Sequence, residues 1–157
     1  MRTLRGPALL SAACIMAALS AAPVFCQAES VSGLRHSENA KTAIGPYSQS
    51  VKAGDFLFVS GQIPLKPGAA AIEAGTVEDQ TRQVLENIKR ILAAAGASLS
   101  QAVKMTVYVT DINHYAAVNK VYAEYFPAPA PARACLGVKE LVKGALVEMD
   151  CIAYVGK

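Results

Sequence analysis

The most regular pattern of apolar and polar positions lies between Thr76 and Gly96, where apolar residues return every three or four positions. This spacing predicts an amphipathic helix with one face in the core. Thr76 is a suitable N-terminal cap, and Gly96 is a suitable C-terminal stop. The predicted core face comprises Val84, Leu85, Ile88, Ile91, Leu92 and Ala95.

A second, shorter helix is predicted from Asp111, which can cap it, to about Phe126. The tyrosines among its apolar positions are interpreted mainly as packing residues. Those apolar positions are Ile112, Tyr115, Val118, Tyr122 and Tyr125.

Strand-like patterns flank both helices. Alternation over residues 103–110 predicts a strand with one core face and one wetter face. The continuous apolar run at residues 56–60 predicts a strand buried on both faces, which residues 61–64 end. The expected core side of the alternating strand comprises Val103, Met105, Val107 and Val109. Further strands are expected at residues 31–36, 47–52, 133–138 and 145–155.

The order of these elements is strands, helix, strand, helix, strands. This order predicts an α+β two-layer domain, a mixed sheet with two helices on one face. The other face of such a sheet is left uncovered. An uncovered face with apolar residues needs a partner, so the pattern also indicates an oligomer.

The N-terminal residues follow a different plan. Two arginines precede an apolar run at residues 8–22, and a helix breaker and small residues follow it. This is the plan of a secretory signal peptide, and the run is short for a membrane span. We expect residues 1–28 to be the signal peptide and residues 29–157 to be the domain, in a secreted or periplasmic protein without a membrane segment after cleavage. An uncleaved N-terminal anchor is the alternative.

The composition and net charge limit the classes of function that the chain can have. The chain has 157 residues, enough for one domain, and its mean hydropathy of +0.30 partly reflects the apolar N-terminal run. Loss of Arg2 and Arg5 with residues 1–28 lowers the formal charge from +3 to +1. A charge this small gives no electrostatic footprint for a nucleic-acid partner.

The cysteines and histidines of the sequence do not form the pattern of a metal site. Cys135 and Cys151 remain after cleavage, either as a disulfide or, in the favoured interpretation, as two buried thiols. The histidines, His36 and His114, have no partner at ligand spacing, so no metal is expected. A Cys135–His114 nucleophile pair has no support in the sequence. Phosphate-binding glycine loops and GxSxG elbows are also absent from the sequence.

Two charged residues lie in apolar strands near the C-terminus. Arg133 follows a Pro/Ala run and must find an anion or water. It can form an ion pair with Glu148 or Asp150, or it can bind a substrate carboxylate through two hydrogen bonds. Chemistry alone does not favour either interpretation. Glu148 is either a solvent-facing strand residue or a partly desolvated general acid/base with a raised pKa.

Five segments in order closely resemble the Rid (YjgF) family, over about residues 41–154. They are residues 44–49 (IGPYSQ), 60–64 (SGQIP), 117–119 (AVN), 131–135 (PARAC) and 148–153 (EMDCIA). The resemblance implies the chorismate-mutase-like (bacillus type) α+β fold. It also implies a homotrimer whose sheets face inward as a β-barrel core, with three clefts between subunits.

The resemblance implies an activity and roles for residues. Well-known members hydrolyse 2-imino acids such as 2-iminobutanoate and 2-iminopropanoate to 2-oxo acids and ammonia, without a cofactor. By resemblance, Arg133 binds the substrate carboxylate, Glu148 activates water and moves protons, and Tyr47 lines and closes the pocket. The residues expected to shape the pocket, from two subunits, are Asn119, Ser60, Gly61 and Cys135.

Two positions and the signal peptide depart from the family pattern. In the family, the residue at the position of Ala134 is often Ser and that at the position of Gly137 is often acidic, so the substrate preference of this chain is open. Most family members are cytosolic, so the expected signal peptide is a further departure. The main alternative function is a non-enzymatic trimeric module that binds small carboxylates or protects against stress as a holdase. Ribonuclease activity, reported for some relatives, is disfavoured by the near-neutral charge and the lack of a basic aromatic face.

Overall fold

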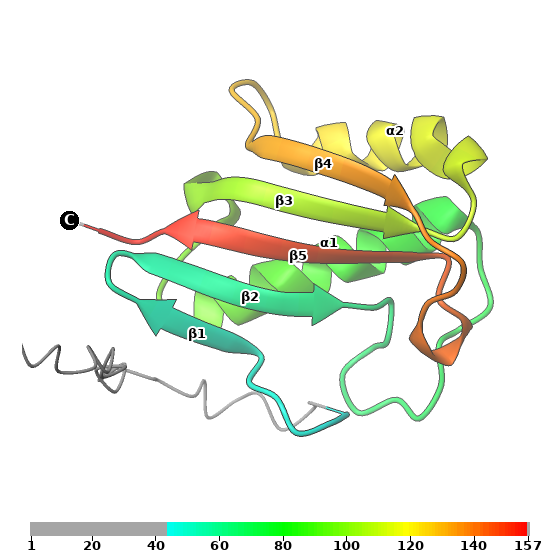
Figure 1. The fold of residues 1–157 in the computed structure, drawn as a ribbon, viewed down its shortest axis with the longest axis horizontal. Helices are drawn as coiled ribbons and strands as arrows, with labels where there is room; N and C mark the ends of the chain where they lie inside the picture. The colour runs from blue at the N-terminus through cyan, green and yellow to red at the C-terminus, as the bar shows by residue number, and fades with distance from the viewer. Residues whose placement is uncertain (1–43, 157) are drawn as a thin grey trace, which may run out of the picture.

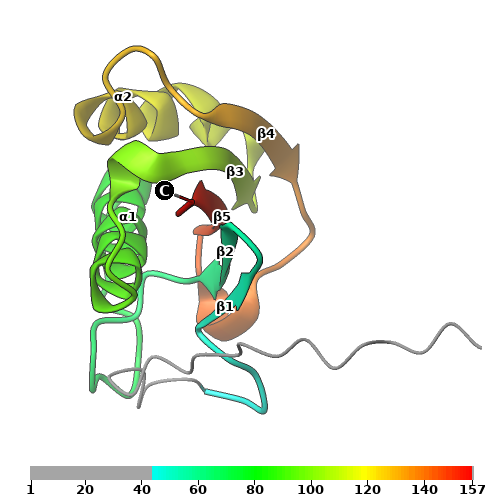
Figure 2. The ribbon, with the colours of Figure 1, turned by 90° about the vertical axis from the view of Figure 1, so that its left-hand side faces the viewer.

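The computed structural model describes residues 44–156, so the expected strand at residues 31–36 and the expected signal peptide lie outside the described residues. A five-stranded sheet with the order β1-β2-β5-β3-β4 forms one layer, and both helices cover one of its faces (Figures 1 and 2). β3 and β4 are parallel, and the other pairs are antiparallel. The elements are β1 (Ser50–Ala53), β2 (Phe56–Gln62), α1 (Val77–Ala94), β3 (Ala102–Val109), α2 (Tyr115–Tyr125), β4 (Ala132–Gly137) and β5 (Val147–Tyr154).

This architecture confirms the predicted α+β fold. None of the helices in residues 44–156 is long and apolar enough to cross a membrane.

Local sequence signals set both ends of α1. Thr76 forms a capping box with Asp79, whose backbone N–H donates to the Thr76 hydroxyl and whose carboxylate accepts from the Thr76 N–H. At the other end Gly96 has a φ of +76°, and the N–H of Ala97 donates to the Leu92 carbonyl over 2.8 Å. A left-handed glycine with this bond ends the helix as predicted.

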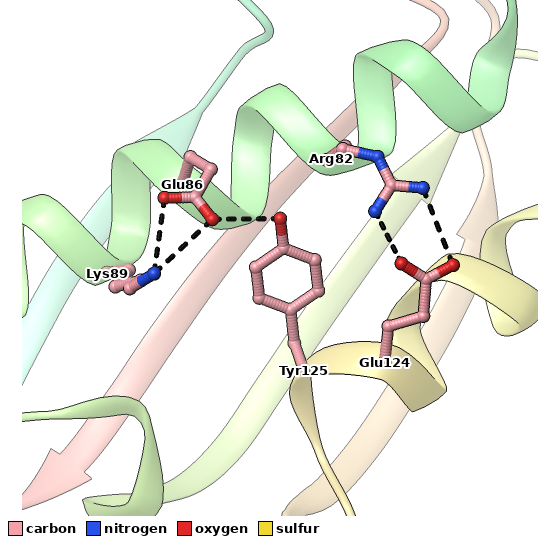
Figure 3. Close-up of polar contacts among 5 residues, drawn as sticks. All are labelled: Arg82, Glu86, Lys89, Glu124 and Tyr125. Atoms are coloured by element: carbon pink, nitrogen blue, oxygen red, sulfur yellow. Dashed lines mark hydrogen bonds and ion pairs between the residues drawn. The ribbon is translucent and has the colours of Figure 1, made fainter.

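α2 begins with a tighter turn than predicted. A 3₁₀ helix, Ile112–His114, precedes it, and the Asp111 carboxylate accepts from the Asn113 N–H over 2.9 Å. Polar contacts fix α2 against α1: Arg82 pairs with Glu124, and the Tyr125 hydroxyl donates to Glu86 over 2.9 Å (Figure 3). The charged side chains of these contacts are exposed, so the contacts mainly align the helices and add little stability.

The core fills the space between the helices and the sheet. α1 contributes residues that are almost wholly excluded from solvent, and β3 and β5 face them with alternate side chains. The alternation predicted for β3 holds from Met105 to Val109. Val103 is the exception, with 42% of its surface exposed, because the β3–β5 register shifts between Ala102 and Lys104 and turns this side chain outward.

The prediction that residues 56–60 are buried on both faces was wrong for the single chain. Leu57 and Val59 are buried, whereas Phe56 and Phe58 are 42% and 44% exposed. They lie on the sheet face without helices, because side chains alternate along a strand. β1 also begins at Ser50, later than the predicted Tyr47, and β2 continues beyond Ser60 to Gln62.

Candidate active site

A break in the β2 ladder creates the first part of the site. The pairing of β2 with β5 shifts register between Val59 and Gln62, so Ser60 and Gly61 leave the regular ladder. The Glu148 side chain from β5 occupies the space beside Gly61. A Cβ on Gly61 would overlap Glu148 Oε1 and lie 3.1 Å from its Cδ. A glycine is therefore needed here for the carboxylate to approach the backbone of β2.

The loop before β1 completes this side of the site. The Ser60 hydroxyl donates to the Ser48 carbonyl over 2.6 Å, and the buried Gln62 amide donates to Gln49 Oε1 over 2.9 Å. These bonds hold the loop that carries Tyr47 against β2. The result is an open pocket of about 460 Å³. It is lined by Ile44, Tyr47, Ser60, Gly61, Ile63, Val142 and Glu148.

Glu148 has the electrostatics of a general acid/base. Burial, and secondarily the charge of Asp150, raises the pKa of the Glu148 carboxyl. Asp150 lies on the same face of β5, and its carboxylate accepts from the Tyr108 hydroxyl over 3.0 Å. The ion pairs among residues 44–156 do not include Glu148. The carboxyl is thus free to exchange protons with a ligand in the pocket.

Arg133 lies in a different environment. Its register partner on β3 is Met105, which is fully buried, so its side chain points to the helix face of the sheet. The guanidinium carbon is 4.6 Å from the ring centroid of Tyr122 and 5.6 Å from that of Tyr115. Arg133 Nη2 also donates to the Tyr115 hydroxyl over 3.3 Å.

Arg133 and Glu148 therefore point to opposite faces of the sheet. The β3 partner of Glu148 is Tyr108, an odd number of positions from Met105, and successive side chains on a strand alternate between faces. The ion pair of Arg133 with Glu148 or Asp150, left open by the sequence, does not form within the described chain.

The predicted site residues thus form two groups. Tyr47, Ser60, Gly61 and Glu148 share the pocket. Arg133 and Cys135 lie on β4, and Asn119 lies on α2 between the two tyrosines that contact Arg133. The Asn119 Oδ1 atom is buried and has no hydrogen-bond partner in the part of the chain that the structure describes. The second group thus retains unused hydrogen-bonding capacity on the β4–α2 side.

The two cysteines are free thiols and cannot pair in this fold. Cys135 is opposite Val107 and Cys151 is opposite Met105, on the two strands that flank β3. Two strand spacings separate them by about 10 Å, beyond the roughly 7 Å that a disulfide spans between Cα atoms. The interpretation as two thiols is confirmed, although only Cys151 is buried and Cys135 is half-buried.

Neither cysteine has the properties of a nucleophile. Burial raises the pKa of the Cys135 thiol against a smaller opposing effect of Arg133, and burial raises that of Cys151 to about 12. Reactive cysteines need a lowered pKa. Within the part of the chain that the structure describes, no group of three or more His, Cys, Asp and Glu side chains could hold a metal ion.

Sequence reasoning missed the partners of Arg133. Tyr115 and Tyr122 were interpreted as packing residues, yet both contact the guanidinium. Their seven-residue spacing places them on one helix face. That spacing, together with a lone arginine in the following strand, was the available signal. Three apolar residues also line the pocket beside Glu148. Ile44 and Ile63 lie in two of the segments that resemble the family, whereas Val142 had no signal in the sequence.

Comparisons with known proteins match this chain to one family and its fold. The family model described as Endoribonuclease L-PSP matches residues 37–155. A RutC family protein of Pyrococcus horikoshii is 56% identical over 117 residues, which cover 74% of this chain and 93% of the relative. The chloroplastic Reactive Intermediate Deaminase A of Arabidopsis thaliana is 46% identical over 116 residues, covering 74% and 62%. The solved structure of Escherichia coli TdcF with bound serine has a TM-score of 0.71 at 42% identity, covering 79% and 98%.

Proposed function

This chain belongs to the Rid (YjgF) family, described as Endoribonuclease L-PSP, and on that premise we propose that it is a hydrolytic deaminase of 2-imino acids. The substrates are reactive imines or enamines such as 2-iminobutanoate and 2-iminopropanoate, and the products are 2-oxo acids and ammonia. The observation that carries the proposal is Glu148, held in a pocket against Gly61. Its carboxyl has a raised pKa and forms no ion pair with the described residues. A relative named as a reactive intermediate deaminase supports the same reaction class.

The complete site needs two subunits. Arg133 and Glu148 point to opposite faces of one sheet, so a single copy cannot present both to one small substrate. In the proposed homotrimer the sheets form an inward-facing barrel, and each cleft joins the pocket of one subunit to the Arg133 side of its neighbour. The exposed apolar residues on the helix-free face support this assembly. They include Phe56, Phe58, Leu136 and Tyr154.

The proposed reaction uses side chains alone. Arg133 holds the substrate carboxylate with charge-assisted hydrogen bonds. The Glu148 carboxylate takes a proton from water as the water oxygen bonds to C2 of the protonated imine. The Glu148 carboxyl then returns that proton to the amine nitrogen. As the C–N bond breaks and ammonia leaves, the Glu148 carboxylate takes the proton of the C2 hydroxyl, so C2 becomes a carbonyl. Glu148 passes this last proton to the departing ammonia, which leaves as ammonium. No cofactor is required, because a protonated imine is already electrophilic.

A second candidate is a non-enzymatic module that binds small carboxylates. The serine bound to TdcF, a structural relative, favours an amino-acid-sized ligand. Glu148 favours the enzyme, because a neighbouring carboxylate does not help to bind an anion. Nothing in the described residues specifically supports a holdase. The small formal charge expected for residues 29–157 argues against a ribonuclease.

The proposal is tested by generating 2-iminobutanoate or 2-iminopropanoate in buffer and following imine loss with purified protein comprising residues 29–157. We expect clear acceleration over buffer and a preference among imines from different amino acids. No acceleration, together with binding of 2-oxobutanoate that is unaltered in Glu148→Gln, would establish the binding module instead.

Gly61→Ala is expected to separate activity from stability. The added methyl group meets the far end of a flexible Glu148 side chain, which can move aside, so the free energy of unfolding should change by less than about 1 kcal/mol. The displaced carboxyl should lower kcat/KM by roughly 10²-fold, since misplacement by about 1 Å is enough for such a loss. Gly75→Ala is the matched control, because its Cβ would also meet a carboxylate side chain, that of Asp79 at 3.3 Å, outside the Glu148 pocket. Equal activities of the two variants, measured alongside their melting temperatures, would contradict the assigned role of Gly61.

The N-terminal segment carries a separate proposal. The sequence of residues 1–28 supports secretion or a periplasmic location, with cleavage near Ala28. N-terminal sequencing of the protein recovered from the periplasm or medium should begin near Glu29. Recovery of the chain with Met1 intact in the cytosol would disprove secretion.

A further inference from the structure

Within residues 44–156, Arg133 is held by aromatic rings rather than by an anion. Its backbone position opposite Met105 directs a cationic side chain toward the apolar core. α2 supplies the faces of Tyr115 and Tyr122 at this point, with the guanidinium carbon 5.6 Å and 4.6 Å from the two centroids. Aromatic faces attract cations, so they lower the cost of holding the charge here without neutralising it.

The donors of Arg133 remain largely unused by the described chain. A guanidinium has five N–H donors, and the structure gives it one bond, from Nη2 to the Tyr115 hydroxyl. The acidic residue of α2, Glu124, is paired with Arg82 of α1 (Figure 3). A cation fixed by ring faces, with its N–H edge free, is arranged to receive a planar anion such as a carboxylate.

The two tyrosines fix different features of the guanidinium. Tyr122 is 6% exposed and packs on Phe126, with 4.5 Å between the ring centroids, so its ring is a rigid platform. Its hydroxyl is buried and has no partner among the described residues, which leaves the ring face as the contributing group. Tyr115 is 45% exposed, and its hydroxyl accepts from Nη2, which sets the rotation of the guanidinium on that platform.

We propose that Tyr115 and Tyr122 are positioning residues, which hold the Arg133 guanidinium at the height and rotation that the substrate carboxylate requires. This inference rests on the proposed deaminase function and deepens it. Arg133 binds the substrate carboxylate in both the ground state and the transition state. Loss of either contact should therefore raise KM and leave kcat nearly unchanged.

Three tyrosine variants test the proposal in the imine assay. Tyr115→Phe keeps the ring and removes the acceptor, and KM should rise roughly threefold to tenfold, the equivalent of one hydrogen bond. Tyr122→Leu removes the platform, and KM should rise roughly tenfold. Tyr122→Phe, which keeps the ring, should restore KM toward the wild-type value. Tyr125→Phe is the control, because Tyr125 donates to Glu86 away from Arg133.

Binding of 2-oxobutanoate by calorimetry provides a readout that does not depend on turnover. The affinity of each tyrosine variant for 2-oxobutanoate should fall by the same factor by which its KM rises. The inference is overturned if Tyr115→Phe keeps both KM and 2-oxobutanoate affinity within about twofold of wild type. This variant decides the matter even if Tyr122→Leu fails to fold, since Tyr115 lies outside the core. Wild-type protein that binds 2-oxobutanoate in this tyrosine-dependent way but hydrolyses no imine would overturn the deaminase alone.

Discussion

Glu148→Gln is expected to abolish imine hydrolysis and, at neutral pH, to raise the melting temperature. Glutamine cannot take a proton from water, so kcat should fall by roughly 10²- to 10⁴-fold, the contribution of general acid–base catalysis. The same change removes a charge that burial and Asp150 both disfavour. A functional group that costs stability is typical of an active site rather than of a structural ion pair.

The sign of the pH dependence follows from the raised pKa of Glu148. The folded state holds this proton more tightly than the unfolded state, so the contribution of Glu148 to stability is greatest below the ordinary glutamate pKa. It is lost as pH rises through the folded-state pKa. The melting temperature of Glu148→Gln should therefore exceed that of wild type at pH 7 and converge with it in acid.

Calorimetric melting at equal protein concentration across this pH range measures the effect, because an oligomer's melting temperature depends on concentration. Glu140→Gln removes the same charge from an exposed position after β4 and serves as the control. A melting temperature of Glu148→Gln that falls below wild type at pH 7 would show that the carboxylate is structurally paired in the assembly.

The parts of the fold that sequence predicted well are those set by neighbouring residues. The capping box of Thr76 and Asp79 and the left-handed Gly96 act over a few positions, so the ends of α1 were readable. The outward turn of Val103 was not, because it results from a register shift between two distant strands. Sheet register depends on long-range pairing, which a local pattern does not encode.

The same limit explains what the sequence revealed about the site. Arg133 and Glu148 were recognised as unusual because each is charged within an apolar strand. Their relative orientation depends on which β3 residues they oppose, Met105 and Tyr108, and only the assembled sheet shows this. The continuous apolar run that includes Phe58 was misinterpreted for a related reason. A residue exposed on one chain and covered in an oligomer has the same sequence signature as a core residue.

Co-expressing two impaired variants should restore activity, and this is the strongest test of a site shared between subunits. Arg133→Ala should lower kcat/KM by roughly 10- to 100-fold, since a charge-assisted contact contributes about 1.5–3 kcal/mol. Glu148→Gln should be less active still. In a mixed oligomer, an intact Arg133 on a Glu148→Gln subunit can face an intact Glu148 on an Arg133→Ala neighbour. Such a site carries the wild-type pair although neither subunit does.

Random assembly from equal amounts predicts the size of the recovery. Each site draws its arginine and its glutamate independently, so about a quarter of the sites regain both residues. Co-expression of the two variants in equal amounts with the same tag on both, followed by purification of all oligomers together and the imine assay, measures the recovery. The double variant Arg133→Ala/Glu148→Gln, co-expressed with wild type, is the control. It should leave about a quarter of all sites intact if sites cross subunits, but about half if each site lies within one subunit. Mixed oligomers no more active than the separate variants would require Arg133 and Glu148 to act within one chain, against their placement on opposite faces of the sheet.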